Sequence, residues 1–129
     1  MIIDSSAIIA ILLRESGWEG LVDKLATESV CAIGAPTLVE TGIVLTAKIG
    51  PKARVMLSRL LQETGLTIVP FADEHWPIAV DAYARFGKGR HPAGLNFGDC
   101  LTYAVARLAE QPLLFVGAAF RKTDLVAAL

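Results

Sequence analysis

Short, continuous apolar runs alternate along the chain with longer segments in which apolar residues recur every three to four positions. The apolar runs predict strands at 1–4, 29–33, 66–71 and 113–116. The periodic segments predict amphipathic helices at 5–13, 17–28, 37–49, 52–64, 73–86 and 97–110. Buried strands that alternate with helices are typical of a parallel sheet covered on both faces. We therefore expect one α/β domain over residues 1–129, with three layers (α/β/α) around a central parallel sheet.

Finer expectations concern two helices and the end of the chain. In the helix at 52–64, the apolar spacing predicts a buried face made by Val55, Met56, Leu60 and Leu61. Asp73 is expected to cap the next helix, because a short carboxylate accepts hydrogen bonds from the free N–H groups at a helix start. The tail at 120–129 is expected to end as a short strand or helix.

The composition indicates a folded protein and raises the question of membrane insertion. Of the 129 residues, 53% are hydrophobic and 19% are charged, which excludes intrinsic disorder. The mean hydropathy is +0.52, yet the apolar stretch Ser5–Leu13 is far shorter than the roughly 20 residues of a spanning helix. It also lacks the cationic segment and the cleavage site of a signal peptide. We expect a cytoplasmic protein with no membrane association and with two free buried cysteines, Cys31 and Cys100.

Acidic and basic residues are unevenly distributed, although the net charge is only −1. Residues 1–47 hold two basic and six acidic groups, residues 48–91 hold seven and four, and residues 92–129 hold three of each. The net charge by itself predicts no attraction to nucleic acid. An acidic site and a separate basic stretch can therefore coexist in one fold.

Three carboxylates stand at positions that suggest chemistry, although each has a structural alternative. Asp4 follows an apolar strand, at the edge where parallel sheets bind ligands, but it is also a good N-cap for the next helix. Glu40 has apolar residues one turn ahead on its own helix face and would need a partner or a cation there, unless it is a surface residue favoured by the helix dipole. Asp99 opens an apolar helix, where it also fits a capping box with Asn96.

Together these acids indicate a site for a divalent metal. They lie on three elements that can converge at one sheet edge, and no Cys or His stands at metal-ligand spacing. Oxygen ligands without Cys or His favour Mg²⁺ or Mn²⁺ over zinc. One or two such ions can activate water for phosphodiester hydrolysis. A phosphoaspartyl phosphatase or a receiver domain also has an Asp after its first strand, but both need a second acid nearby, and Asp4 stands alone.

Five segments of the sequence resemble the PIN-domain toxins of the VapC type. They are Ile-Ile-Asp-Ser-Ser-Ala at 2–7, Val-Glu-Thr at 39–41, Gly-Leu-Asn-Phe-Gly-Asp-Cys at 94–100, Pro-Leu-Leu-Phe-Val-Gly at 112–117 and Thr-Asp-Leu at 123–125. The likeness runs nearly end to end. It implies a PIN-like fold, an endoribonuclease that hydrolyses RNA with a water activated by Mg²⁺ or Mn²⁺, and inhibition by a cognate VapB-type antitoxin.

The resemblance also implies roles for individual residues. Asp4, Glu40 and Asp99 match the family's catalytic metal ligands. Asp124 matches a further acidic position and is an additional candidate ligand. The expected supporting residues are Ser6, Asn96 and Thr123. The resemblance and the high apolar content both favour a homodimer and a groove for a partner helix.

One segment departs from the family pattern. After the last strand, the family usually has one or two acidic or amide residues that supply a fourth acid, whereas this chain has Ala118 and Ala119. Neither alanine can bind a cation. A second function therefore stays open, that of a catalytically weakened or inactive PIN-like domain that acts by binding its antitoxin. Metal-dependent cleavage of RNA separates the two functions.

A basic loop rich in glycine precedes Asp99. RNA that binds beside an acidic metal site needs cations for its neighbouring phosphates, although an ordinary solvated loop is the alternative. The expected RNA-binding residues are Arg85, Lys88, Arg90 and His91. Four aromatic residues are expected in the core or at an interface rather than as base-stacking platforms: Trp18, Phe71, Trp76 and Phe86.

Overall fold

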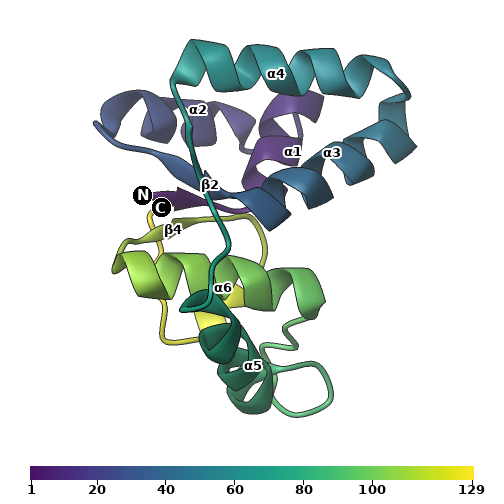
Figure 1. The fold of residues 1–129 in the computed structure, drawn as a ribbon. Helices are drawn as coiled ribbons and strands as arrows, with labels where there is room; N and C mark the ends of the chain where they lie inside the picture. The colour runs from purple at the N-terminus through teal and green to yellow at the C-terminus, as the bar shows by residue number, and fades with distance from the viewer.

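The computed structural model describes residues 1–129, which form a parallel sheet between two layers of helices (Figure 1). The strands are β1 (Ile2–Ile3), β2 (Ala32–Gly34), β3 (Thr67–Val69) and β4 (Leu113–Leu114). The helices are α1 (Ser5–Leu13), α2 (Trp18–Thr27), α3 (Ala35–Ile49), α4 (Lys52–Thr64), α5 (His75–Phe86) and α6 (Phe97–Ala109), followed by the 3₁₀ turn η1 (Phe120–Lys122). The strand order is β3-β2-β1-β4 and every pairing is parallel. The expected α/β/α architecture is confirmed.

The sheet separates two apolar clusters, because successive residues of a strand point to opposite faces. Ile2 and Leu113 pack in the cluster formed with α5 and α6. Ile3 and Leu114, each one position further along, pack in the cluster formed with α1, α2 and α4. Figure 1 shows the same division, with α1 to α4 on one side of the strands and α5 and α6 on the other. The two faces of one short sheet thus hold all the layers together.

The strands are shorter than the apolar runs in the sequence. β2 begins at Ala32 rather than at residue 29, and β4 ends at Leu114 rather than at residue 116. Pairing stops there, but burial continues, since Phe115 packs into the core beyond the strand. An apolar run indicates that a segment is buried, but only part of a buried segment pairs with a neighbouring strand, so the strands are shorter than the runs.

Two helices differ from the sequence expectation. α3 begins at Ala35, earlier than expected, with Pro36 in its first turn, where the missing N–H has no intrahelical partner to lose. In α4 the buried residues are Ala53 and Leu57, whereas Val55 is 60% exposed. The predicted buried face of α4 was therefore wrong at Val55, because α4 carries apolar residues on more than one side and the packing partners select one of them.

The start of α5 and the tail also have their own arrangements. Asp73 does not cap α5, which begins at His75. The backbone N–H of Ala72 donates instead to Nδ1 of the buried His75 ring, at 2.9 Å. The tail forms η1 and then returns to the sheet, where Ala127 makes a single parallel bridge to Leu113.

Both cysteines, Cys31 and Cys100, are buried and free, as expected. Both chain ends lie against β4, since Ile2 pairs with Leu113 and Ala127 bridges to the same residue (Figure 1). None of the helices is both long enough and apolar enough to cross a membrane.

Candidate functional site

The three carboxylates singled out in the sequence stand at the carboxyl edge of the sheet, and each is carried by a different element. Asp4 follows β1, and its N–H donates to the carbonyl of Leu114 at 2.9 Å, which extends the pairing of β1 with β4. Glu40 lies early in α3, the helix that leaves β2. Asp99 lies in the first turn of α6, which packs against α3. Ligands of parallel sheets bind at this edge.

Asp4 is held by Ser6, the residue that the sequence placed beside it as a supporting hydroxyl. Asp4 is 4% exposed. Its Oδ2 accepts hydrogen bonds from the N–H of Ser6 at 3.1 Å and from the Ser6 hydroxyl at 2.5 Å. Ser6 Oγ in turn accepts from the N–H of Val116 at 3.0 Å. Asp4 is thus the N-cap of α1, and its Oδ1 makes no hydrogen bond. It also belongs to the acidic edge, the part of the sheet edge that carries Asp4, Glu40 and Asp99.

Asp99 is fixed by a capping box with Asn96, as the sequence predicted. Asn96 Oδ1 accepts from the N–H of Asp99 at 2.8 Å, and Asp99 Oδ2 accepts from the N–H of Asn96 at 3.0 Å. The two bonds hold the Asp99 side chain against the start of α6 and occupy one of its oxygens. Asn96 therefore orients Asp99 by capping the helix, and the other oxygen of Asp99 stays available.

Glu40 reaches the same edge from α3 and lies against the backbone of Gly98. A Cβ built at Gly98 would collide with the Glu40 carboxylate. Glycine at this position therefore lets the carboxylate of one helix approach the backbone of another. The contact brings Glu40 beside the residue that precedes Asp99 in α6.

The three charges affect one another. Burial raises the pKa of Asp99, and the charges of Asp4 and Glu40 raise it further, while the hydrogen bond from the Asn96 N–H works in the opposite direction. None of the three carboxylates forms a salt bridge. Grouped carboxylates without a counter-charge repel each other, and a bound cation is the usual way to relieve that repulsion.

The donor set fits a hard divalent cation. It consists of carboxylate oxygens, the ligands that Mg²⁺ and Mn²⁺ prefer, and Asp4 and Asp99 each keep one oxygen without a hydrogen bond. The three acids are not gathered closely enough to form a closed ligand cluster as they stand. Coordination of one ion by all three therefore requires side-chain movement, for which the longer Glu40 has the most rotatable bonds.

Asp124, the additional candidate ligand, has other partners. Its Oδ1 accepts from the Tyr103 hydroxyl at 2.7 Å, and its Oδ2 accepts from Arg85 at 3.2 Å. Burial alone would raise the pKa of Asp124, but the bonds from Tyr103 and Arg85 and the charges of Arg85 and Arg107 hold it below its ordinary value. Since both oxygens are engaged, we leave Asp124 out of the ligand set. Arg85, expected to contact RNA, directs its guanidinium to Asp124 and Tyr103.

The segment between β4 and the tail brings no acid to the edge. Ala118 is exposed and Ala119 is half-buried, so the positions at which the family usually has acidic or amide residues carry no ligand. Thr123, expected to support the site, donates from its hydroxyl to the carbonyl of Phe120 at 2.6 Å. It closes the η1 turn and contacts none of the three acids by a hydrogen bond.

The basic loop leads directly into α6. Lys88 and Arg90 are exposed and form no salt bridge, and the Arg90 guanidinium lies 5.6 Å from the ring centre of Tyr83. His91 is half-buried, and its Nδ1 accepts from the N–H of Ala93 at 3.0 Å, which orders the loop. Contact of this loop with RNA stays a prediction.

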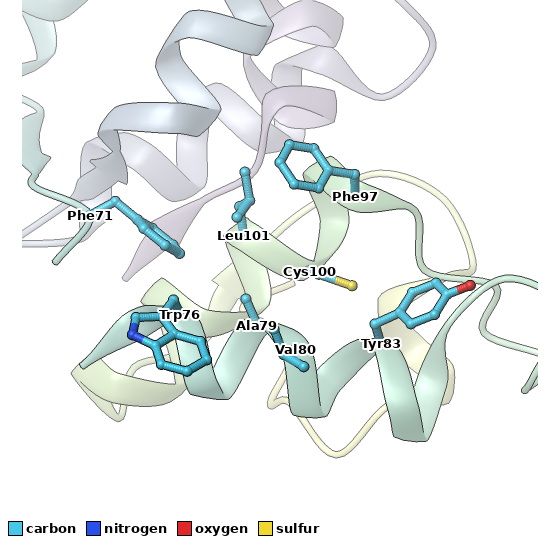
Figure 2. A pocket seen from close by; sticks show the side chains of 8 residues that line it. All are labelled: Phe71, Trp76, Ala79, Val80, Tyr83, Phe97, Cys100 and Leu101. Carbon is cyan, nitrogen blue, oxygen red and sulfur yellow. The ribbon is translucent and has the colours of Figure 1, made fainter. Parts of the chain in front are cut away.

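The sequence predicted a groove for a partner helix without placing it, and the structure has an apolar hollow between α5 and the start of α6 (Figure 2). Its volume is about 410 Å³, and all of its lining residues are hydrophobic. Trp76, Val80 and Phe97 line it with 60%, 61% and 79% of their surfaces exposed. A second hollow, between α3 and α6, shares Phe97 and includes Glu40. The available signal was a second apolar stripe on α5, since Trp76, Val80 and Tyr83 recur at helical spacing apart from the buried stripe.

Comparison with known proteins gives relatives along almost the whole chain. A family model of the PIN domain matches residues 1–125. Ribonuclease VapC36 of Mycobacterium tuberculosis is 48% identical over 126 residues, which cover 97% of this chain and 91% of that protein.

Two crystal structures share the fold. One is VapC20 of Mycobacterium tuberculosis, described as a sarcin-ricin loop cleaving toxin, with a TM-score of 0.78, 18% identity and coverage of 97% and 95% of the two chains. The other is VapBC2 of Rickettsia felis bound to a DNA fragment from their promoter, with a TM-score of 0.75, 15% identity and coverage of 98% and 95%. At these identities the two structures support the fold alone. The family model and the relative at 48% identity go further, and the chain belongs to the PIN-domain family, in its VapC group.

Proposed function

We propose that this chain is the toxin of a type II toxin–antitoxin system, an endoribonuclease that depends on Mg²⁺ or Mn²⁺ and hydrolyses phosphodiester bonds of RNA. Asp4, Glu40 and Asp99 lie along one sheet edge, near enough for their charges to act on Asp99 and without a salt bridge to any of them, and this observation carries the proposal. The relatives named as ribonucleases support the same substrate class.

The three acids would hold the metal, and their neighbours would hold the acids. A metal bound there would stabilise charge on the scissile phosphate and lower the pKa of an attacking water. Ser6 engages one oxygen of Asp4, and Asn96 engages one oxygen of Asp99, so the other oxygen of each acid is free to bind a metal. The nucleophile would be water, and no side chain would form a covalent intermediate with the RNA.

The basic loop would bind the RNA backbone next to this edge. Lys88 and Arg90 are exposed and without acidic partners, so their charges are available to phosphates that flank the scissile one. His91 lies in the same loop and is included among the proposed RNA-binding residues. We place this activity in the cytoplasm as part of the proposal.

The two apolar hollows would receive a protein partner. They meet at Phe97 beside Glu40, so a bound partner would cover the approach to the acids. We assign this role to a VapB-type antitoxin, whose binding would inhibit cleavage. We also propose that the toxin is a homodimer, which light scattering of the purified chain tests directly.

The function is tested by cleavage of a structured RNA pool by the purified chain. Cleavage is expected with Mg²⁺ or Mn²⁺ and not with EDTA. Asp4→Asn should lower the rate by more than about a hundredfold, since even supporting residues of metal sites cost 10- to 100-fold. Asp23→Asn, which removes the same charge from an exposed position of α2, should cleave like the wild type. Cleavage by Asp4→Asn at the wild-type rate would contradict the assignment.

A second function is favoured by Ala118 and Ala119. With no acid at either position, the chain would act as a weakened or inactive PIN-like domain that binds its antitoxin. Absence of cleavage with either metal, together with retained antitoxin binding, would support this function. Cleavage of RNA by the Ala119→Asp variant would then show that the missing acid is the reason for the absent activity.

A further inference from the structure

Two buried threonine hydroxyls join the helices that carry Glu40 and Asp99. Thr37 Oγ1 of α3 and Thr102 Oγ1 of α6 lie 2.8 Å apart. The two residues are 2% and 1% exposed. No other side-chain hydrogen bond and no salt bridge joins α3 to α6. The hydroxyl pair is therefore the only directional contact between side chains of these two helices.

Each threonine stands one helical turn from an acid. Thr37 comes three residues before Glu40, and Thr102 comes three residues after Asp99. Residues at this spacing lie on the same face of a helix. The hydroxyl pair consequently sets the relation of α3 to α6 at a point directly beside the acids, where a small slide or rotation of one helix changes the distance between the two carboxylates.

The narrow space around Glu40 makes the position of its carboxylate sensitive to how α3 packs on α6. The Glu40 carboxylate lies so close to Gly98 that even a methyl group there would collide with it. An apolar contact tolerates sliding, whereas a hydrogen bond weakens steeply when its distance or angle changes. A hydroxyl pair holds the register of two helices more narrowly than two methyl groups in the same place.

Packing alone does not require the two hydroxyls. Valine has nearly the same shape as threonine, and burial of a hydroxyl costs free energy that only its hydrogen bond offsets. Polar pairs that are fully satisfied in a core specify one arrangement among several similar ones. This pair lies next to two acids from different helices. The arrangement that it specifies is therefore the placement of Glu40 relative to Asp99.

We propose that Thr37 and Thr102 are positioning residues that set the distance between Glu40 and Asp99 and thereby the affinity of the acidic edge for a divalent cation. This inference rests on the proposed function. It assigns a role to residues that contact neither the metal nor the RNA.

The test is the double variant Thr37→Val/Thr102→Val, compared with the wild type in calorimetric titrations of Mn²⁺ into RNA-free protein. Replacing both partners by apolar groups of the same shape is nearly neutral for stability, so the variant should keep the melting temperature of the wild type. Its Mn²⁺ affinity should fall by about tenfold or more, as for supporting residues of metal sites. RNA cleavage should need correspondingly more Mn²⁺ and recover at saturating Mn²⁺.

Two further variants serve as controls. Thr102→Ser keeps the hydroxyl and should keep the Mn²⁺ affinity. Thr41→Val removes another buried hydroxyl of α3, which donates to the carbonyl of Thr37 within the same helix at 2.7 Å, and should also keep it. If the double variant folds poorly, Thr102→Val alone is compared with Thr41→Val at matched melting temperature.

The outcomes separate the two proposals. Wild-type Mn²⁺ affinity in the double variant, or an equal loss of affinity in Thr41→Val, would overturn the positioning role and leave the proposed nuclease intact. A wild-type protein that neither binds Mn²⁺ nor cleaves RNA would overturn the proposed function and the positioning role together.

Discussion

The hydroxyl of Tyr103 donates a hydrogen bond to Oδ1 of Asp124 at 2.7 Å and ties the C-terminal tail to α6. Tyr103 is 2% exposed, and Arg85 and Arg107 approach the other oxygen of Asp124 at 3.2 and 3.7 Å. A carboxylate that the sequence motif suggested as a metal ligand therefore anchors the tail. It does so on the helix whose first turn carries Asp99.

Tyr103→Phe should destabilise the protein without changing the acidic edge. The variant removes one hydrogen bond to a charged group, which contributes about 1–3 kcal/mol to the free energy of unfolding, and the partial exposure of Asp124 favours the lower end. The midpoint of urea unfolding measures the effect. Tyr83→Phe is the matched control, because the Tyr83 side chain is 44% exposed and its hydroxyl has no hydrogen-bond partner in the protein. Equal midpoints for the two variants would contradict this assignment.

The same pair predicts how stability depends on pH. Burial and the bond to Asp124 raise the pKa of Tyr103 from 10.0 to about 12, so its contribution is present below pH 10 and is lost as the pH rises from 10 to 12. The pKa of Asp124 is lowered below 3.8, so its contribution is present above that pH and is lost as the pH falls through its folded-state pKa. Urea midpoints between pH 9 and 12 should fall more steeply for the wild type than for Tyr103→Phe. Parallel curves would count against the raised pKa.

Ser6→Ala should weaken the nuclease while preserving the fold. Ser6 Oγ connects Asp4 with the N–H of Val116, and its loss leaves the Asp4 carboxylate held by the Ser6 N–H alone. We expect cleavage to fall by about 10- to 100-fold, as for other supporting residues of metal sites. The rate of RNA cleavage at fixed Mn²⁺ is the measurement. Ser58→Ala, at an exposed position of α4, should cleave like the wild type, and a Ser6→Ala rate equal to that of Ser58→Ala would refute the role.

Gly98→Ala should displace Glu40 from the edge. Alanine favours helix by about 1 kcal/mol over glycine, but its Cβ would collide with the Glu40 carboxylate, so the side chain must turn away. We expect at least a tenfold loss of Mn²⁺ affinity, measured by calorimetry. Gly20→Ala is the control, because a Cβ at Gly20 in α2 meets nothing within 4 Å; it should keep the affinity. Unchanged affinity in Gly98→Ala would show that Glu40 does not depend on this contact.

Features that depend on near neighbours along the chain were predictable. The order of strands and helices followed from short apolar runs and helical periodicity, and the family resemblance gave the expected architecture. The capping box of Asn96 and Asp99 and the N-cap role of Asp4 were also expected, and both are present. Each of these interactions links residues only two or three positions apart, so the sequence shows both partners together.

Features that depend on distant partners were missed or misplaced. The buried face of α4 could not be selected, since apolar residues such as Val55 and Leu57 lie on different sides and the rest of the fold decides which side it covers. That choice has no signature within α4 itself. The start of α5 was misassigned for a local reason instead, since the His75 ring accepts from the N–H of Ala72 and stacks on Phe71 at a ring-centre distance of 5.0 Å, and this alternative to an Asp73 cap was overlooked.

The sequence by itself determined the alternation of strands and helices, the local caps and the three acids that suggest a metal. Only the tertiary structure decided which groups meet: that Asp124 pairs with Tyr103 and Arg85, and that Thr37 bonds Thr102 across 65 residues. Periodicity and capping are set by the geometry of one helix or strand. A hydrogen bond between helices depends instead on how all the layers pack, and no short stretch of sequence records that arrangement.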